Sequence, residues 1–171
     1  ILADDMGLGK TVQSLAHTAY RKESGALQKP VLIVCPRSVL PNWQSELAKF
    51  APELKYVVLW GEDRQSRYDQ AAECDVVFTT YRVLLRDTVY ISRSRLKFSG
   101  VFLDEAQAIK TSHTRIARAV GSLSCLYKVS LTGTRIENKL NELWSQFNFL
   151  LPGFLGTRRE FNRDFRRPIE A

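Results

Sequence analysis

This 171-residue sequence lacks the marks of a membrane-spanning or secreted protein and of a protein with a structural metal site. No apolar run approaches the ~20 residues that span a bilayer, and no signal peptide is visible. The three cysteines, Cys35, Cys74 and Cys125, form no Cys-x-x-Cys pair, and the two histidines, His17 and His113, are isolated. We therefore expect an intracellular protein with reduced thiols, no membrane partner and no structural metal site.

Acidic residues are too few to balance the basic ones. There are 25 lysines and arginines against 18 aspartates and glutamates, which gives a formal net charge of +7. This excess favours a partner with a phosphate backbone, although basic side chains also serve simply to keep a surface soluble. The length suits one domain with a sizeable core.

Short apolar runs alternate with helical patterns along the chain. The runs are continuous rather than alternating in polarity, which indicates strands buried on both faces of a parallel sheet. They cover residues 31–35, 56–60, 76–79, 101–103 and 128–131, with the end of a sixth strand at residues 1–3.

Apolar stripes with helical spacing lie at residues 12–19, 40–50, 116–123 and 140–151. We predict Ser38 as the N-cap of the second helix, with Pro41 in its first turn. Trp43 and Trp144 occupy core positions of their stripes. The alternation predicts an α/β fold with a doubly wound, mostly parallel sheet and helices on both faces. Such a sheet binds ligands at the carboxyl ends of its strands.

The stretch ADDMGLGKT near the start ends like a phosphate-binding loop. Gly7 and Gly9 permit a tight turn. Lys10 and Thr11 supply a cation for the phosphates and a hydroxyl for Mg²⁺. A helix that begins near Lys10 adds its positive N-terminus. Asp4 replaces the first glycine of the strict motif, so a glycine turn that merely precedes a helix is the alternative.

Two further motifs follow predicted strands. Asp104 and Glu105 end the run at residues 101–103, where an aspartate can hold Mg²⁺ and a glutamate can orient and deprotonate a water molecule. Thr132-Gly133-Thr134 follows the last strand, on the same edge of the sheet, and its hydroxyls are candidates for sensing the γ-phosphate. Thr134 and Glu137 also fit a capping box for the next helix.

In this order the three motifs resemble those of the first RecA-like lobe of helicase superfamily two, and more narrowly those of the SWI/SNF-type DNA translocases. The segments VLIVCPRSVLPNWQSELAKF and DVVFTTYRVLLRD are similar to motifs Ia and Ib of that family. The resemblance covers nearly the whole chain, and it implies a three-layer RecA-like P-loop NTPase fold.

Residues 1–151 are expected to form the first ATP-binding lobe, truncated at its N-terminus. Residues 152–171 are expected to form a basic helical segment, with a capping box at Thr157 and Glu160, leading toward a missing helical insertion or second lobe.

The resemblance also implies roles for individual residues. The catalytic residues would be Lys10, Asp104 and Glu105. The nucleotide would be bound by Asp5, Met6, Gly7, Leu8, Gly9, Lys10, Thr11 and Gln107. The Mg²⁺ ion would be held by Thr11 and Asp104. ATP and DNA would be coupled by Thr132, Gly133 and Thr134. The DNA backbone would be contacted by Pro36, Arg37, Ser38, Thr80 and Tyr81.

The implied function is a DNA-dependent ATPase that uses ATP and Mg²⁺, translocates on double-stranded DNA and remodels protein–DNA complexes. Its partners would be the DNA backbone, the second RecA-like lobe of the same parent chain, and a nucleosome or RNA polymerase. A strand-separating helicase and a catalytically silent DNA-binding or scaffold module are the alternatives. Gln107 favours a bacterial or archaeal cytoplasm; a eukaryotic member would be nuclear.

Two departures from the family pattern affect these expectations. Arg135 stands where the family usually has proline, which leaves the coupling of ATP to DNA either altered or unchanged. The second lobe, which supplies the arginine fingers, is absent from this chain. Since such a finger is worth about 10³–10⁵ in rate, we expect the fragment alone to be nearly inactive.

Overall fold

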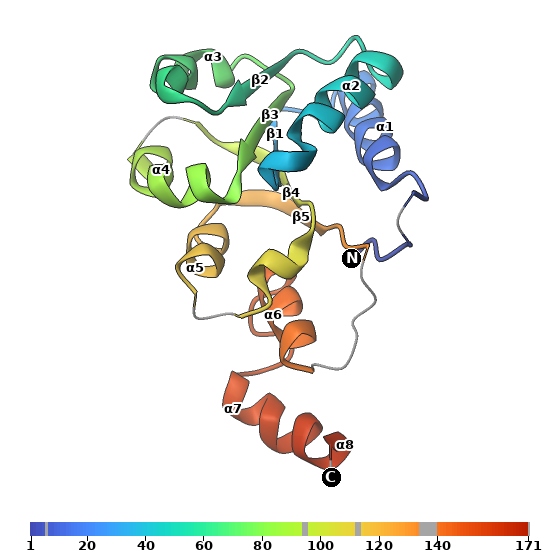
Figure 1. Ribbon diagram of the computed structural model, residues 1–171, viewed down its shortest axis with the longest axis vertical. Coiled ribbons are helices and arrows are strands. Elements are labelled where there is room, and N and C mark those ends of the chain that lie inside the picture. Colours follow the sequence, from blue (N-terminus) through green and yellow to red (C-terminus); the bar gives the residue numbers. More distant parts are fainter. Residues whose placement is uncertain (6, 94–95, 112–113, 134–139, 171) are drawn as a thin grey trace.

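Five parallel strands form the centre of the molecule (Figure 1). The computed structural model describes residues 1–5, 7–93, 96–111, 114–133 and 140–170. The strand order is β2-β3-β1-β4-β5, and every neighbouring pair is parallel. The strands are β1 (Val31–Cys35), β2 (Tyr56–Leu59), β3 (Val76–Thr80), β4 (Phe98–Leu103) and β5 (Cys125–Ser130). The predicted parallel sheet is therefore confirmed.

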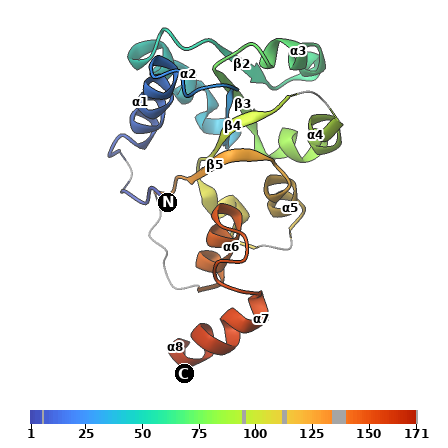
Figure 2. The same cartoon turned by 180° about the vertical axis from the view of Figure 1, so that it is seen from behind.

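Helices cover both faces of this sheet, as predicted (Figures 1 and 2). One face carries α1 (Lys10–Glu23) and α2 (Leu40–Phe50). The other carries α4 (Tyr81–Arg93), α5 (Arg115–Gly121) and α6 (Leu140–Leu150), with the short α3 (Tyr68–Ala71) beside β2.

The central strand β1 shows how the core is divided between the two faces. All of its residues are buried. Ile33 packs with the α1 and α2 side, whereas Leu32 and Val34 pack with the α4 side. Because successive side chains of a strand point to opposite faces, a continuous apolar run fills two hydrophobic layers. The result is the expected three-layer α/β arrangement.

Several strand boundaries differ from the predicted ones. β4 begins at Phe98 and β5 at Cys125, earlier than predicted in both cases. In β4 the apolar run is interrupted by Gly100, because a Cβ atom there would lie only 2.3 Å from the ring of Tyr127. β2 ends at Leu59, so Trp60 falls outside the sheet. At the N-terminus the predicted sixth strand is reduced to an isolated parallel bridge between Leu2 and Leu131.

The predicted N-cap at Ser38 is wrong. Ser38 lies inside a 3-10 turn, η1 (Arg37–Val39), and Val39 takes the N-cap position of α2 without a side-chain cap. A capping residue needs a non-helical backbone, but the chain already turns at Arg37, so the extended backbone lies before Ser38, at Pro36 (ψ 148°). Pro41 lies in the first turn of α2 as predicted. The proposed cap at Thr134 and Glu137, together with Arg135, lies outside the described residues.

The C-terminal segment extends away from the sheet (Figure 1). It contains α7 (Arg158–Phe161), a π-helical turn η4 (Asn162–Arg166) and α8 (Arg167–Glu170). The capping box between Thr157 and Glu160 is present as predicted. None of the helices in the described part of the chain combines the length and apolar character needed to cross a membrane.

A buried polar network attaches α4 to the segment that follows β2. That segment contains a 3-10 helix, η2 (Glu62–Arg67). The guanidinium of Arg64 donates two hydrogen bonds to the carboxylate of Asp87, at 2.7 and 2.9 Å, and the hydroxyl of Tyr68 donates another at 2.8 Å. All three residues are buried. Burial acts to raise the pKa of Asp87, but the hydrogen bonds from Arg64 and Tyr68 outweigh it and hold that pKa below its ordinary value.

We expect Asp87→Asn to lower the free energy of unfolding by about 3–5 kcal/mol, because it leaves the buried Arg64 cation without a countercharge. Urea unfolding at neutral pH measures the loss, and Asp69→Asn, at an exposed position of α3, is the matched control. The contribution of Asp87 is present above the ordinary carboxyl pKa and is lost as the pH falls through the lowered folded-state value. The difference in the free energy of unfolding between the wild type and Asp87→Asn should therefore become smaller only in strong acid. Equal unfolding midpoints at neutral pH would contradict this account.

Candidate functional site

The glycine loop leads into α1 and leaves the start of that helix open. Gly9 has a left-handed backbone with φ of 75°, and no side chain caps the helix. The first N–H groups of a helix have no partner within the helix, and they carry its positive dipole end. The ammonium group of Lys10 donates to the backbone carbonyls of Asp4 at 2.7 Å and Asp5 at 2.9 Å. This loop therefore presents N–H groups and a lysine cation in one place, as an anion site requires.

The acidic pair follows β4 directly. The N–H of Asp104 donates to the carbonyl of Val34 at 2.9 Å, which extends the sheet contact to this residue. Glu105 has φ of 51°, the only positive value for a non-glycine residue in the described ranges. Such a backbone costs about 1–3 kcal/mol and is concentrated at functional sites. The N–H of Glu105 donates to Oδ1 of Asp104 at 3.0 Å, and Nε2 of Gln107 donates to Oε2 of Glu105 at 2.6 Å.

The loop and the acidic pair face one cavity of about 270 Å³. The predicted residues that line it are Gly7, Gly9, Lys10, Thr11, Asp104, Glu105 and Gly133. Three lining residues were missed by sequence reasoning, namely Val39, Asn42 and Glu46. They come from η1 and α2, and no local sequence pattern predicts that these elements lie beside the glycine loop.

Other predicted residues lie beside this cavity rather than in its wall. Asp5 and Leu8 shape the loop through their backbone, and Gln107 turns its amide toward Glu105. Thr132 is buried, and its N–H donates to the carbonyl of Leu2 at 3.1 Å. Met6 and Thr134 lie outside the described residues.

The donor set of the cavity suits Mg²⁺ bound to a phosphate. Mg²⁺ prefers oxygen ligands, and Thr11, which carries a hydroxyl, and Asp104, which carries a carboxylate, both line this cavity. Burial raises the pKa of Asp104 above its ordinary value. Hydrogen bonds from Trp43 and the Glu105 backbone and the charge of Lys10 act in the opposite direction but do not outweigh burial. The residues present therefore fit a nucleotide with its metal ion.

Trp43 is a site residue that the sequence interpretation assigned only to the core. It is buried as predicted, with 1% of its surface exposed. Its indole N–H also donates to Oδ2 of Asp104 at 2.8 Å. A buried tryptophan usually has a partner for its N–H, which is the one signal that pointed to a polar neighbour.

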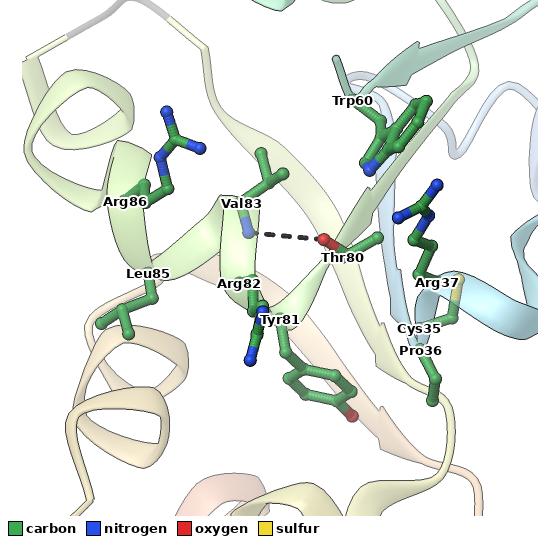
Figure 3. Close-up of a pocket in the computed structure, with 10 residues that line it drawn as sticks. All are labelled: Cys35, Pro36, Arg37, Trp60, Thr80, Tyr81, Arg82, Val83, Leu85 and Arg86. Atoms are coloured by element: carbon green, nitrogen blue, oxygen red, sulfur yellow. Dashed lines mark hydrogen bonds between the residues drawn. The ribbon is translucent and has the colours of Figure 1, made fainter. Parts of the chain in front are cut away.

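A second cavity, of about 720 Å³, opens at the ends of β1, β2 and β3 (Figure 3). Four of the residues predicted to contact DNA line it: Pro36, Arg37, Thr80 and Tyr81. Ser38 does not. The remaining lining residues are Cys35, Trp60, Arg82, Val83, Leu85 and Arg86.

This second cavity is basic. The guanidinium of Arg37 stacks over the ring of Trp60 at 4.7 Å from its centroid, and Arg82 and Arg86 project from α4 as exposed side chains (Figure 3). No carboxylate is among the described residues that line it. The hydroxyl of Thr80 accepts from the N–H of Val83 at 3.3 Å and so fixes the start of α4. Sequence reasoning missed Trp60, Arg82 and Arg86, although the two arginines stand four residues apart, as on one face of a helix.

Tyr81 connects the two cavities. Its ring points away from Trp60 (Figure 3), and it is only 7% exposed. Its hydroxyl donates to the backbone carbonyl of Asp104 at 2.8 Å. Burial keeps the pKa of the phenol well above its usual range, so the group remains a hydrogen-bond donor.

Comparisons with known proteins agree on one family. The family model of the SNF2-related domain matches residues 1–171. A putative ATP-dependent helicase/translocase, YwqA of Bacillus subtilis, is 45% identical over 99% of this chain. The chromatin-remodeling ATPase INO80 of Lodderomyces elongisporus is 40% identical over the whole chain.

Solved structures give the same result. The Sulfolobus solfataricus SWI2/SNF2 ATPase core in complex with dsDNA matches 99% of this chain with a TM-score of 0.89 and 46% identity. A second structure, of the Sulfolobus solfataricus SWI2/SNF2 ATPase core domain, gives a TM-score of 0.85 and 46% identity. The chain spans 18% of the B. subtilis protein, 12% of the L. elongisporus protein and 35% of the Sulfolobus chain in complex with dsDNA.

Proposed function

This chain belongs to the SNF2-related family of ATPase domains, and we propose that it is the ATP-binding lobe of a motor that translocates on double-stranded DNA. The observation that carries the proposal is the pairing of two cavities along one edge of the sheet. One combines a Gly-Lys-Thr loop with two acids, and the other combines three arginines with an aromatic ring. The resemblance to a Sulfolobus ATPase core in complex with dsDNA supports the same assignment.

In the first cavity, each group has a chemical task. The start of α1 and the ammonium of Lys10 bind and orient the phosphates, and Lys10 exchanges the carbonyls of Asp4 and Asp5 for phosphate oxygens. Bound Mg²⁺, held by Thr11 and Asp104, would supply neutralisation of the phosphate charge. Gln107 holds Oε2 of Glu105, so Oε1 is the oxygen that accepts the proton of the attacking water.

In the second cavity, the three arginines bind the phosphates of a DNA strand. Arg37, Arg82 and Arg86 are placed on two different elements around the carboxyl ends of β1 and β3. Phosphate contacts carry no sequence information, which suits a motor that must move along any duplex. The substrate of this motor would be a protein–DNA complex, with nucleosomes and RNA polymerase as candidate partners.

The described arrangement also supports the proposed division of the chain. Residues 1–151 would form the first lobe, and residues 152–171 would lead toward a second lobe in the parent protein. The helices of that C-terminal segment stand apart from the sheet (Figure 1). Completion of the site by a cation from the second lobe would then be required for fast hydrolysis.

We expect the isolated chain to bind Mg²⁺–ATP but to hydrolyse it about 10³–10⁵-fold more slowly than the full-length protein, because that is the rate enhancement an arginine finger provides. Radiolabelled ATP hydrolysis with and without duplex DNA measures both rates. In the full-length protein, Glu105→Gln should abolish DNA-stimulated hydrolysis while nucleotide binding persists. DNA-stimulated turnover of the isolated chain near the full-length rate would contradict this expectation, and an inactive full-length protein would favour a scaffold module.

We expect DNA affinity to fall with salt by roughly 0.9 log unit per log unit of salt for each phosphate neutralised. Arg82→Ala and Arg86→Ala should each reduce this slope by about one phosphate contact. Arg118→Ala, an exposed arginine on α5 outside the cavity, is the matched control and should leave the slope unchanged. If neither cavity variant changes the salt dependence of DNA affinity, the DNA binds at a surface other than this cavity.

We expect the full-length protein to displace the third strand of a triplex when ATP is present, without separating the strands of the duplex. Both activities can be followed with the same labelled DNA, and Glu105→Gln serves as the inactive control. Efficient strand separation would instead identify a helicase, the alternative function within this family.

A further inference from the structure

Asp104 is held in place from both faces of the sheet. Its Oδ2 accepts from the indole of Trp43 at 2.8 Å and its Oδ1 from the N–H of Glu105 at 3.0 Å. Its main-chain carbonyl accepts from the hydroxyl of Tyr81 at 2.8 Å, and its N–H donates to Val34 at 2.9 Å. Two hydrogen bonds thus hold the carboxylate of Asp104, and two hold its main chain.

Two of these bonds come from elements that begin at the basic cavity. Trp43 lies in α2, directly after the η1 turn that carries Arg37. Tyr81 is the first residue of α4, immediately after Thr80 and before Arg82. Both donors are buried, at 1% and 7% exposure, and their hydrogen-bonding groups reach Asp104 rather than the cavity surface.

We propose that Trp43 and Tyr81 are positioning residues that transmit the occupancy of the basic cavity to Asp104, and thereby couple DNA binding to the binding of Mg²⁺–nucleotide. This inference rests on the proposed function. Phosphates bound by Arg37 and Arg82 act on the starts of α2 and α4, and each start is linked to Asp104 by one directional hydrogen bond. A shift of either element therefore changes the orientation of the carboxylate or the stability of its present orientation.

The two routes act on different atoms. Trp43 fixes a carboxylate oxygen, which affects the direction in which Asp104 meets the metal shell. Tyr81 fixes the backbone carbonyl between Asp104 and Glu105, so it affects the position of both acids and the left-handed backbone of Glu105. Loss of either bond should weaken the coupling, and loss of both should weaken it more.

Thermodynamic linkage provides a quantity, the coupling factor between DNA and nucleotide binding, that a purely structural role of Trp43 and Tyr81 would not affect. If DNA alters the affinity for nucleotide by some factor, nucleotide alters the affinity for DNA by the same factor, typically about 5–150-fold. A variant that only loosens the fold lowers stability but leaves this factor intact. A variant that interrupts the link brings the factor toward unity.

The experiment measures, on the full-length protein, the affinity of a fluorescent non-hydrolysable ATP analogue with Mg²⁺, with and without saturating duplex DNA. Tyr81→Phe removes only a hydroxyl, and Trp43→Phe removes the indole N–H while retaining an aromatic ring. We expect each to reduce the coupling factor by roughly 2- to 30-fold, the range corresponding to the effects of coupling mutations.

Matched controls separate the bonds to Asp104 from general effects of the substitutions. Tyr90→Phe removes the hydroxyl of a partly exposed tyrosine in the same helix as Tyr81. Trp144→Phe removes another buried indole, whose N–H donates to the carbonyl of Gly156 at 3.2 Å, away from the cavities. Both should retain the wild-type coupling factor.

The possible outcomes are distinct. A coupling factor of unity in the wild-type protein, or a wild-type factor in both Tyr81→Phe and Trp43→Phe, overturns the inference while leaving the proposed function standing. Failure of the wild-type protein to bind either DNA or nucleotide defeats the proposed function itself. If Trp43→Phe does not fold, Tyr81→Phe decides alone, because loss of one hydroxyl retains the packing of its ring.

Discussion

The common direction of the five strands is the constraint on which both cavities depend. Parallel strands deliver all of their carboxyl ends to one edge, and the chain must leave that edge through loops. β1 lies between β3 and β4, so the turns after all three meet at the centre of the edge. An acid after β4 and a basic surface after β1 and β3 are then neighbours, although they are far apart in sequence.

This neighbourhood creates a problem of buried polar groups, which the structure solves by hydrogen bonding. Asp104 is partly desolvated, and an unpaired carboxylate there would be costly. The indole of Trp43 comes from one helical layer and the hydroxyl of Tyr81 from the other. The acid at the end of β4 is therefore a point where the three layers are joined by directional bonds as well as by apolar contact.

The sequence predicted the layers and the motif loops well, because buried strands and glycine turns leave strong local patterns. It could not predict features that depend on packing between distant segments. Gly100 interrupts a strand because the ring of Tyr127 lies against it, and Ser38 lost its expected role to a turn. Trp60 gave no periodic signal of its own; only the folded sheet brings it to one cavity with Arg82 and Arg86. The hydrogen bond from Trp43 likewise depends on tertiary placement, although its burial was predicted correctly.

The stacking of Arg37 on Trp60 has an entropic consequence for the capture of a moving strand. A free arginine side chain gives up as much as about 2 kcal/mol of rotational freedom when it is immobilised. A guanidinium that already stacks on an indole has lost part of that conformational entropy before any ligand binds. Each phosphate that reaches it can then be gripped and released with a smaller ordering cost, which is favourable for a contact that must be made many times in succession.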